Sequence, residues 1–226
     1  MADLVSLGLP GNEQSWAALG FRVDRERLQI GSVSCVLNMP PSWGFDEVRA
    51  DASVLGIPEL VSENISAAPD PTHRAEQVLE HLADDPDSAR ATDVDKPRAP
   101  AHPNGVSAID HLVYLVADLD EAVAGMTDVL GMPPRRRFHP RGPAGPEMAF
   151  YRVGEPFIEV VAGGQPALIG IAFATPDLDA TVAAARAAGA PIGDPKPAVQ
   201  GGRIASVWSG HVEWGVAFMG AVGSRG

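Results

Sequence analysis

Residues 108–120, Ala-Ile-Asp-His-Leu-Val-Tyr-Leu-Val-Ala-Asp-Leu-Asp, predict one β-strand that leads directly into a capped helix. A short apolar run is typical of a buried strand. Asp118 and Glu121 then have the spacing of a capping box, which marks the start of a helix. The helix is expected to end at Leu130, because Gly131 and two prolines follow it.

A similar stretch returns at 167–179, Ala-Leu-Ile-Gly-Ile-Ala-Phe-Ala-Thr-Pro-Asp-Leu-Asp. Aligning the two Asp-Leu-Asp triplets places His111 opposite Gly170. Short strands are expected after each helix, at 135–138, 147–153 and 156–161 in the first copy and at 204–208 and 215–219 in the second. The repeat therefore predicts two βαβββ modules, at 105–164 and 165–222.

The first 104 residues divide into two further segments. Strands are expected at 4–9, 21–23, 28–30, 33–37 and 45–52, with a short helix at 15–19. This order predicts a degenerate βαβββ-like unit at 1–60. Residues 61–104 are rich in proline and acidic side chains, which predicts a solvated connector with one helix at 71–83.

Composition narrows the class of protein and its partners. The chain has 226 residues, of which 45% are hydrophobic and 20% charged, as in ordinary globular proteins. A net charge of −12 argues against nucleic acid or an anionic membrane as a partner. No apolar run is long enough for a membrane helix, and the start lacks the pattern of a signal peptide. Cys35 is the only cysteine, which excludes an internal disulfide and fits a cytoplasmic protein; we expect it to be buried.

Several motifs together resemble the vicinal oxygen chelate superfamily of glyoxalases, bleomycin-resistance proteins and extradiol dioxygenases. They are Ile-Asp-His at 109–111, the Asp-Leu-Asp cap, Leu130-Gly131, Phe-Ile-Glu at 157–159 and the duplicated plan. The resemblance implies an α+β fold in which tandem βαβββ modules form a half-open curled β-sheet barrel with flanking helices. It also implies a divalent metal ion (Zn, Ni, Fe or Mn), held by the first and last strands of each module, that accepts two adjacent substrate oxygens.

The family pattern assigns His111 and Glu159 as metal ligands and catalytic residues. The matching positions in the last module, Gly170 and Ala217, carry no donor, so two of four ligand positions are filled. Other side chains that could complete the set are His211, Glu47, His102 and His139. Without a metal, a carboxylate beside an imidazole could still act as a general base.

Alternative interpretations remain open for each of these residues. His111 could be a hydrogen-bonded strand histidine, and Glu159 could pair with Arg203. The basic cluster of Arg135–Arg137 and Arg141 could attract an anionic substrate or form a solvated strand edge. The residues predicted to line a substrate pocket are Gln200, Arg203, Trp208, Tyr151 and Phe138.

Three functions are compatible with this sequence. The first is a metal-dependent lyase or isomerase acting on a small oxygenated molecule. The second is a non-catalytic protein of sequestration or resistance type, which the missing ligands and the negative charge favour. The third, a partner-binding module, has only the acidic connector to support it. A small-molecule ligand and a monomer or homodimer are expected in the first two cases.

Overall fold

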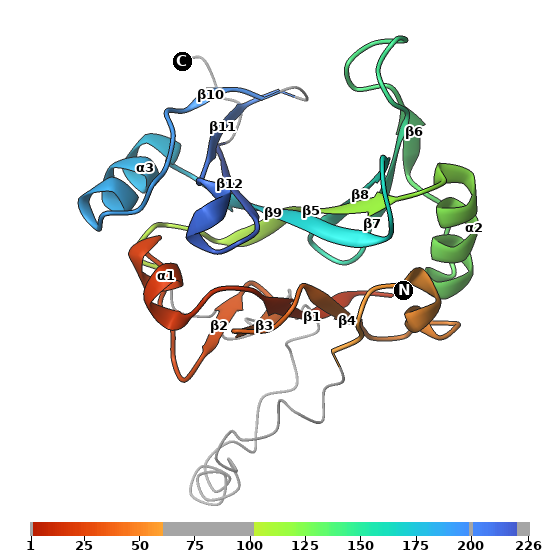
Figure 1. The fold of residues 1–226 in the computed structure, drawn as a ribbon, viewed down its shortest axis with the longest axis horizontal. Helices are drawn as coiled ribbons and strands as arrows, with labels where there is room; N and C mark the ends of the chain where they lie inside the picture. Colours follow the sequence, from red (N-terminus) through yellow and green to blue (C-terminus); the bar gives the residue numbers. More distant parts are fainter. Residues whose placement is uncertain (1, 61–101, 199–200, 221–226) are drawn as a thin grey trace, which may run out of the picture. The chain divides into compact units, whose positions relative to one another are not determined.

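The described part of the chain in this computed structural model, residues 2–60, 102–198 and 201–220, contains two β-sheets. One has eight strands and curls, and the other has four strands (Figure 1). The predicted connector helix at 71–83 and the predicted pocket residue Gln200 lie outside the described residues.

The eight-stranded sheet consists of the two predicted βαβββ modules, so the expected fold class is confirmed. The first module has β5 (Ala108–Val116), α2 (Leu119–Leu130), β6 (Arg136–Phe138), β7 (Met148–Arg152) and β8 (Phe157–Ala162). The second has β9 (Ala167–Thr175), α3 (Leu178–Ala187), β10 (Lys196–Pro197), β11 (Arg203–Ser206) and β12 (Gly215–Gly220). The strand order is β10-β11-β12-β9-β5-β8-β7-β6, and in each module the first strand pairs in parallel with the last.

The two long helices begin and end as their sequences predict. Asp118 accepts a hydrogen bond from the Glu121 N–H at 2.9 Å, and Asp177 accepts one from the Ala180 N–H at 2.9 Å. Gly131 ends α2 with φ of 68°, a left-handed conformation that glycine adopts without strain. Helix α2 packs beside β7 and β8, and α3 beside β11 and β12, so the helices flank the sheet (Figure 1).

The modules join through their first strands, because β5 pairs with β9 in antiparallel fashion at the centre of the sheet. The pairing contains two register shifts. Ile109 faces Phe173 and His111 faces Ala172, which leaves Asp110 as the extra residue of a β-bulge. The second shift leaves Ile169 as the extra residue on β9. Asp110 and Ile169 occupy matching positions of the repeat. Both modules therefore have the bulge, but its extra residue is acidic in the first module and apolar in the second.

The N-terminal unit contains a strand, a helix and three further strands, but its sheet connectivity is different from that of the modules. The strand expected at 21–23 does not form, because the Phe21 N–H donates back to the Trp16 carbonyl at the end of the helix. Its elements are β1 (Leu4–Leu9), α1 (Glu13–Ala18), β2 (Arg27–Ile30), β3 (Val33–Leu37), β4 (Ser42–Phe45) and a 3-10 helix at Ala52–Leu55. The strand order is β2-β3-β1-β4, so β1 pairs in parallel with the third strand, and β4 adds antiparallel to the other edge. The last strand was expected at 45–52 but lies at Ser42–Phe45, because Glu47 has a positive φ of 48° that a strand cannot continue.

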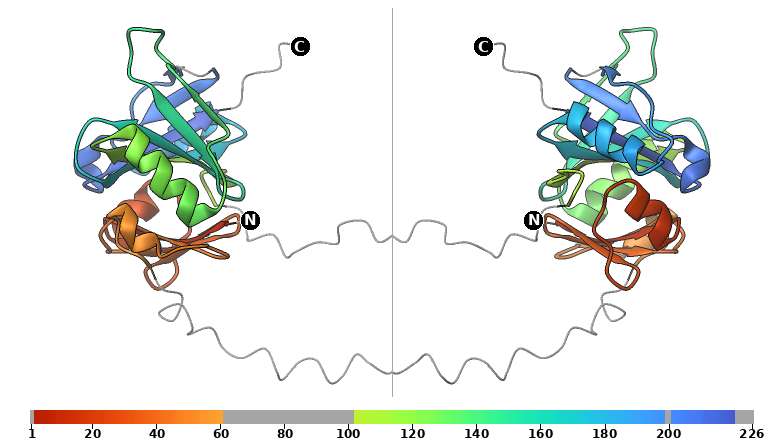
Figure 2. Two further views of the ribbon diagram at one scale, coloured as in Figure 1. Left: turned by 90° about the vertical axis from the view of Figure 1, so that its right-hand side faces the viewer. Right: turned by 90° about the vertical axis from the view of Figure 1, so that its left-hand side faces the viewer.

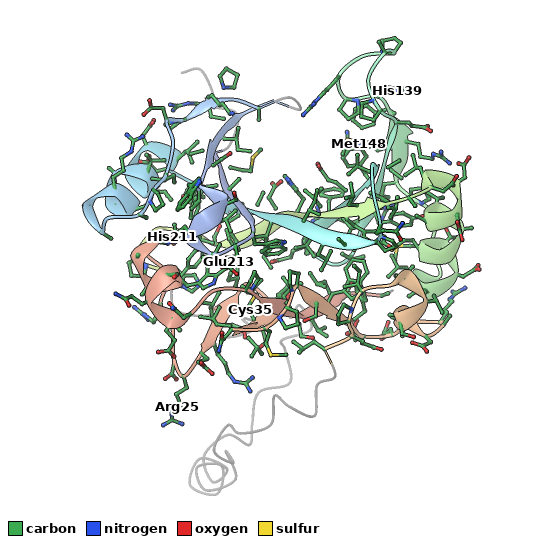
Figure 3. All side chains as sticks on the ribbon, viewed as in Figure 1. Arg25, Cys35, His139, Met148, His211 and Glu213 are labelled. Carbon is green, nitrogen blue, oxygen red and sulfur yellow. The ribbon has the colours of Figure 1, made fainter. Side chains whose placement is uncertain are left out.

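Apolar side chains join both sheets into one core. The Tyr114 ring of β5 lies 5.1 Å from the Trp43 ring of β4, and its hydroxyl donates to the Leu55 carbonyl at 2.6 Å. The Phe173 ring of β9 lies 4.9 Å from Phe21. Figure 2 shows from both sides that the N-terminal sheet lies along one face of the large sheet. The predicted burial of Cys35 is confirmed, and burial raises the pKa of its thiol (Figure 3).

His102 ties the start of the first module to the N-terminal sheet. Its Nδ1 accepts from the Arg22 N–H at 3.0 Å, so Nε2 carries the proton and donates to the Gln29 carbonyl at 3.0 Å. Burial lowers the pKa of this imidazole; the hydrogen bond to Gln29 opposes that shift and the charge of Arg22 adds to it. The folded protein therefore prefers neutral His102.

We expect His102 to make the protein less stable in acid. Because the pKa of His102 is lower in the folded state, its contribution is complete above the unfolded value of about 6.5 and is lost as the pH falls below it. His102→Gln should lower the free energy of unfolding by about 1–3 kcal/mol at pH 7.5 and by less at pH 5.5. Urea unfolding of both proteins at the two pH values measures this, and an equal loss at both would contradict the assignment.

Candidate active site

A cavity of about 530 Å³ opens on the face of the large sheet opposite the N-terminal sheet. Strand β5 contributes side chains to both faces of the sheet. Ile109, Leu112 and Tyr114 are buried in the core, whereas His111 lines the cavity. The apolar walls come from Met148, Phe150, Phe157, Ile204 and Met219, which belong to both modules. The cavity is therefore shared between the two modules.

The bulge on β5 brings Asp110 and His111 to the cavity together. Consecutive residues of a regular strand point to opposite faces, but both of these side chains line the cavity. His111 Nδ1 lies 2.7 Å from Asp110 Oδ2, within hydrogen-bond distance. Asp110 therefore fixes the orientation of the imidazole through Nδ1, and the other ring nitrogen, Nε2, remains available for a different partner.

Glu159 of β8 lies on the other side of the His111 ring. Its Oε2 is 4.0 Å from His111 Nε2, and the exposed fractions of the two side chains are 14% and 16%. This separation is too long for a direct hydrogen bond, so a ligand atom can contact both groups. The His111 imidazole thus lies between two carboxylates, with Asp110 at Nδ1 and Glu159 near Nε2.

The acidic neighbours raise the pKa of His111. Burial lowers this pKa, but the hydrogen bond to Asp110 and the negative charges of Glu159 and Asp110 together outweigh that effect. The imidazole therefore keeps its proton to a higher pH than an ordinary histidine. A protonated His111 can donate a hydrogen bond from Nε2 to a substrate oxygen.

The donors present do not fit a four-ligand metal site. Val113 pairs with Glu159 as Ala172 pairs with Ala217, which confirms that Ala217 occupies the position matching Glu159. At Gly170 a Cβ would lie 3.1 Å from the carbonyl oxygen of Gly215, so close strand packing leaves little room for a ligating side chain there. Within the described residues no group of three or more His, Cys, Asp or Glu side chains is arranged to hold a metal ion.

Three cations also line the cavity: Arg136 of β6, Arg141 of the β6–β7 loop and Lys196 of β10. The predicted basic cluster is thus divided between two environments. Arg136 and Arg141 face the cavity, whereas Arg137 pairs outside it with Asp120 and Glu147, both at 2.8 Å.

The predicted pocket residues that the structure describes do not themselves line the cavity. Tyr151 is fully buried and donates to the Val123 carbonyl of α2, because it points to the opposite face from Phe150. Trp208 is 66% exposed, outside the cavity. Arg203 pairs with Asp179 of α3 rather than with Glu159. Phe138 reaches the cavity only indirectly, since its ring stacks on Phe150 at 5.0 Å.

The remaining candidate ligands lie elsewhere in the described structure. His211 Nε2 contacts the Ser15 carbonyl at 2.9 Å, beside α1 (Figure 3). His102 joins the N-terminal sheet. His139 lies on the arm formed by β6 and β7, where Nδ1 contacts the Gly145 carbonyl at 2.8 Å (Figure 3). Glu47 is exposed and follows β4. None of the four lines the cavity.

Sequence reasoning missed Asp110, Lys196 and the wall residue Phe150. Two consecutive polar residues, Asp110 and His111, within an apolar strand were the available signal for the bulge. Lys196 was missed because no strand was expected between the second helix and residue 204, where the two-residue strand β10 lies.

Comparisons with known proteins return one family and a group of solved structures. Residues 110–206 match the model of the Glyoxalase/Bleomycin resistance protein/Dioxygenase superfamily. Methylmalonyl-CoA epimerase from Mycobacterium tuberculosis is similar with a TM-score of 0.48 and 20% identity, over 54% of this chain and 93% of that chain. A variant of Streptomyces coelicolor methylmalonyl-CoA epimerase in complex with 2-nitronate-propionyl-CoA gives 0.44 and 18%, over 52% and 99%. A hypothetical protein from Bacillus halodurans C-125 gives 0.45 and 14%, over 52% and 96%.

No curated protein matches the chain. None of the helices in the described part of the chain has the length and apolar character needed to cross a membrane.

Proposed function

We propose, from the match of residues 110–206 to the glyoxalase, bleomycin-resistance and dioxygenase superfamily, that the chain is a glyoxalase-like isomerase or lyase. Its reaction would begin by moving a proton from a carbon next to a carbonyl group. The observation that carries this proposal is the array of Asp110, His111 and Glu159 at a cavity wall, with separations of 2.7 Å and 4.0 Å.

Each member of the array has one role in this proposal. Glu159 takes the proton from the carbon, and the electron pair of the C–H bond forms the double bond of an enolate. The negative charge develops on the carbonyl oxygen, where protonated His111 donates a hydrogen bond from Nε2. Asp110 positions the imidazole and favours its cationic form. Return of the proton to the opposite face of that carbon, or to the neighbouring carbon, completes an isomerisation, and loss of a leaving group from the neighbouring carbon completes an elimination.

The proposal assigns every step to side chains of the chain, because the donor set does not fit a four-ligand metal site. A divalent ion held by His111 and Glu159 alone stays a prediction. Metal analysis of protein purified without added metal, repeated on His111→Ala, tests it. Stoichiometric metal that disappears in the variant would place an ion at this pair.

Proton exchange tests the proposed function without knowledge of the product. The protein is incubated in deuterated water with enolisable carbonyl compounds, beginning with 4-phenyl-2-oxobutyrate, and loss of the C–H signal is followed by NMR. We expect exchange above the buffer rate at carbon 3, next to the keto group. Exchange at the buffer rate across 2-oxo acids, 2-hydroxy ketones and branched acyl thioesters would contradict an enzyme of this type.

A second candidate, a non-catalytic small-molecule binding protein, is favoured by the absence of donors at Gly170 and Ala217. The same experiment separates the two functions. A compound that binds in the cavity but exchanges no proton would support binding without chemistry.

We predict that Asp110→Asn lowers the pKa of His111. The variant removes both the charged hydrogen-bond partner and one of the two negative charges near the ring. Because the folded pKa is raised, cationic His111 is complete at low pH and is lost as the pH rises through that value. The alkaline limb of the exchange rate should therefore move to lower pH in the variant, together with the NMR titration of His111.

The matched control for this prediction is Asp128→Asn, on an exposed position of α2. It should leave both the titration and the pH profile unchanged. An unchanged His111 titration in Asp110→Asn would show that Asp110 does not set the charge of the ring.

A further inference from the structure

We infer that the rim of the cavity binds an anionic group of the ligand, and that the ligand is a small organic acid or phosphate ester with an apolar body. This inference rests on the proposed function for the location of the reacting carbon, but the binding itself does not depend on catalysis. The inference rests on three cationic side chains, which we call the rim cations: Arg136, Arg141 and Lys196.

Arg136 is held in position by two aromatic rings. Its guanidinium carbon lies 4.7 Å from the centre of the Phe138 ring and 4.8 Å from that of Phe150, which are cation–π distances. Phe150 is itself a wall of the cavity. The planar guanidinium is therefore oriented at the cavity by packing, which lowers the cost of fixing it around a carboxylate or phosphate.

Arg141 and Lys196 come from opposite arms of the curled sheet. Arg141 lies in the loop after β6, and Lys196 lies on β10, at the other edge of the strand order. Among the described residues, no carboxylate lies within 4.0 Å of either cationic group, whereas Arg137 and Arg203 outside the cavity both form such pairs. Cations that converge on one cavity from separate segments of the chain are suited to bind an anion.

The charge distribution also orients the ligand. The chain has a net charge of −12, yet three cations face this cavity. Asp110 and Glu159 are the acidic side chains among its lining residues. An anionic group is attracted to the rim cations and repelled by these carboxylates, so the ligand would present its other functional group to His111 and Glu159.

The walls select the body of the ligand. Met148, Phe150 and Phe157 from the first module and Ile204 and Met219 from the second line the same cavity as the rim cations and the acidic pair. Apolar walls with a few polar groups are typical of small-molecule sites. An apolar or aromatic body attached to the anion would remove these side chains from water.

Calorimetry with matched probes tests this inference. The probes are 4-phenyl-2-oxobutyrate, its neutral carboxamide and 2-phenylethyl phosphate. We expect either anion to bind at least 10-fold more tightly than the carboxamide, and affinity to fall as salt is added. A tighter carboxylate identifies an organic acid and a tighter phosphate identifies a phosphate ester. Equal binding of all three probes, or no binding, would overturn the inference.

Variants locate the anion within the protein. Arg136→Ala and Lys196→Ala should each weaken binding of the preferred anion about 10-fold, while Arg137→Ala, which removes a neighbouring cation outside the cavity, should not. Arg136→Lys should recover part of the loss, because it keeps the charge but not the planar fork. An equal loss in Arg137→Ala would show a general charge effect and refute the site.

Glu159→Gln separates failure of this inference from failure of the proposed function. The variant should bind the anion at least as tightly as the wild type, because a negative charge has been removed from the cavity. Anion binding without proton exchange in the wild type would refute the enzyme and keep the rim site. Proton exchange without any preference for anions would refute the rim site and keep the proposed enzyme.

Discussion

Replacing Glu159 by Gln should reduce enzyme-dependent proton exchange by about 10³-fold while the fold is kept. Glutamine has almost the same shape as glutamate, but its amide cannot accept a proton from carbon. The side chain lies on β8, within a regular pairing of β8 with both β5 and β7, so the substitution leaves the strand in place. The exchange rate of 4-phenyl-2-oxobutyrate in deuterated water, or of whichever compound of the panel exchanges fastest, measures the effect.

The control for this variant is Glu147→Gln. Glu147 is also partly buried, but it pairs with Arg137 outside the cavity, so exchange should stay within about 2-fold of the wild type. If Glu159→Gln kept more than a tenth of the exchange rate, Glu159 would not be the base. Asp110, the other carboxylate that lines the cavity, would then become the candidate.

The modules could be predicted from sequence because their signals are local. The N-caps Asp118 and Asp177 each bond to a backbone N–H three residues away, and Gly131 ends α2 through its own backbone conformation. The repeat then supplies the order of strands. Likewise His111 and Glu159 could be assigned to one site, because the family pattern places its ligands on the first and last strands of a module, and these strands, β5 and β8, are paired.

The rest of the site depends on pairings between distant residues. The bulge that turns Asp110 towards the cavity exists only in the register of β5 against β9. A difference of one residue on β7 separates Phe150, which lines the cavity, from Tyr151, which is buried under α2. Arg203 was predicted to reach the cavity or Glu159, but Asp179, on a helix packed against its strand, binds it instead.

The order of strands in the N-terminal sheet also depends on pairings between distant residues. Its strands were largely expected, but their order depends on which edges meet, and β4 joins the free edge of β1. Its place in the core depends likewise on contacts between distant residues, since Phe21 packs against Phe173 of β9 and Phe218 of β12.

Replacing Phe173 by Ala should lower the free energy of unfolding by about 3–5 kcal/mol, the largest stability effect that we expect of a single substitution here. Phe173 is fully buried on β9, and its ring lies 6.0 Å from Trp16, 4.9 Å from Phe21 and 5.9 Å from Phe218. Trp16 and Phe21 belong to the N-terminal unit and Phe218 to β12. Removal of the ring would leave a cavity where the two sheets meet, and the neighbouring rings can fill it only in part.

Urea unfolding measured by tryptophan fluorescence and by circular dichroism tests this prediction, with Phe138→Ala as the matched control. Phe138 is partly exposed on β6 and stacks on one ring, so its loss should cost about 1 kcal/mol. If both sheets form one cooperative core, the two signals should shift together in Phe173→Ala. A cost no larger than that of Phe138→Ala, or loss of the Trp16 environment while the large sheet stays folded, would mean that residues 2–60 cover the sheet without stabilising it.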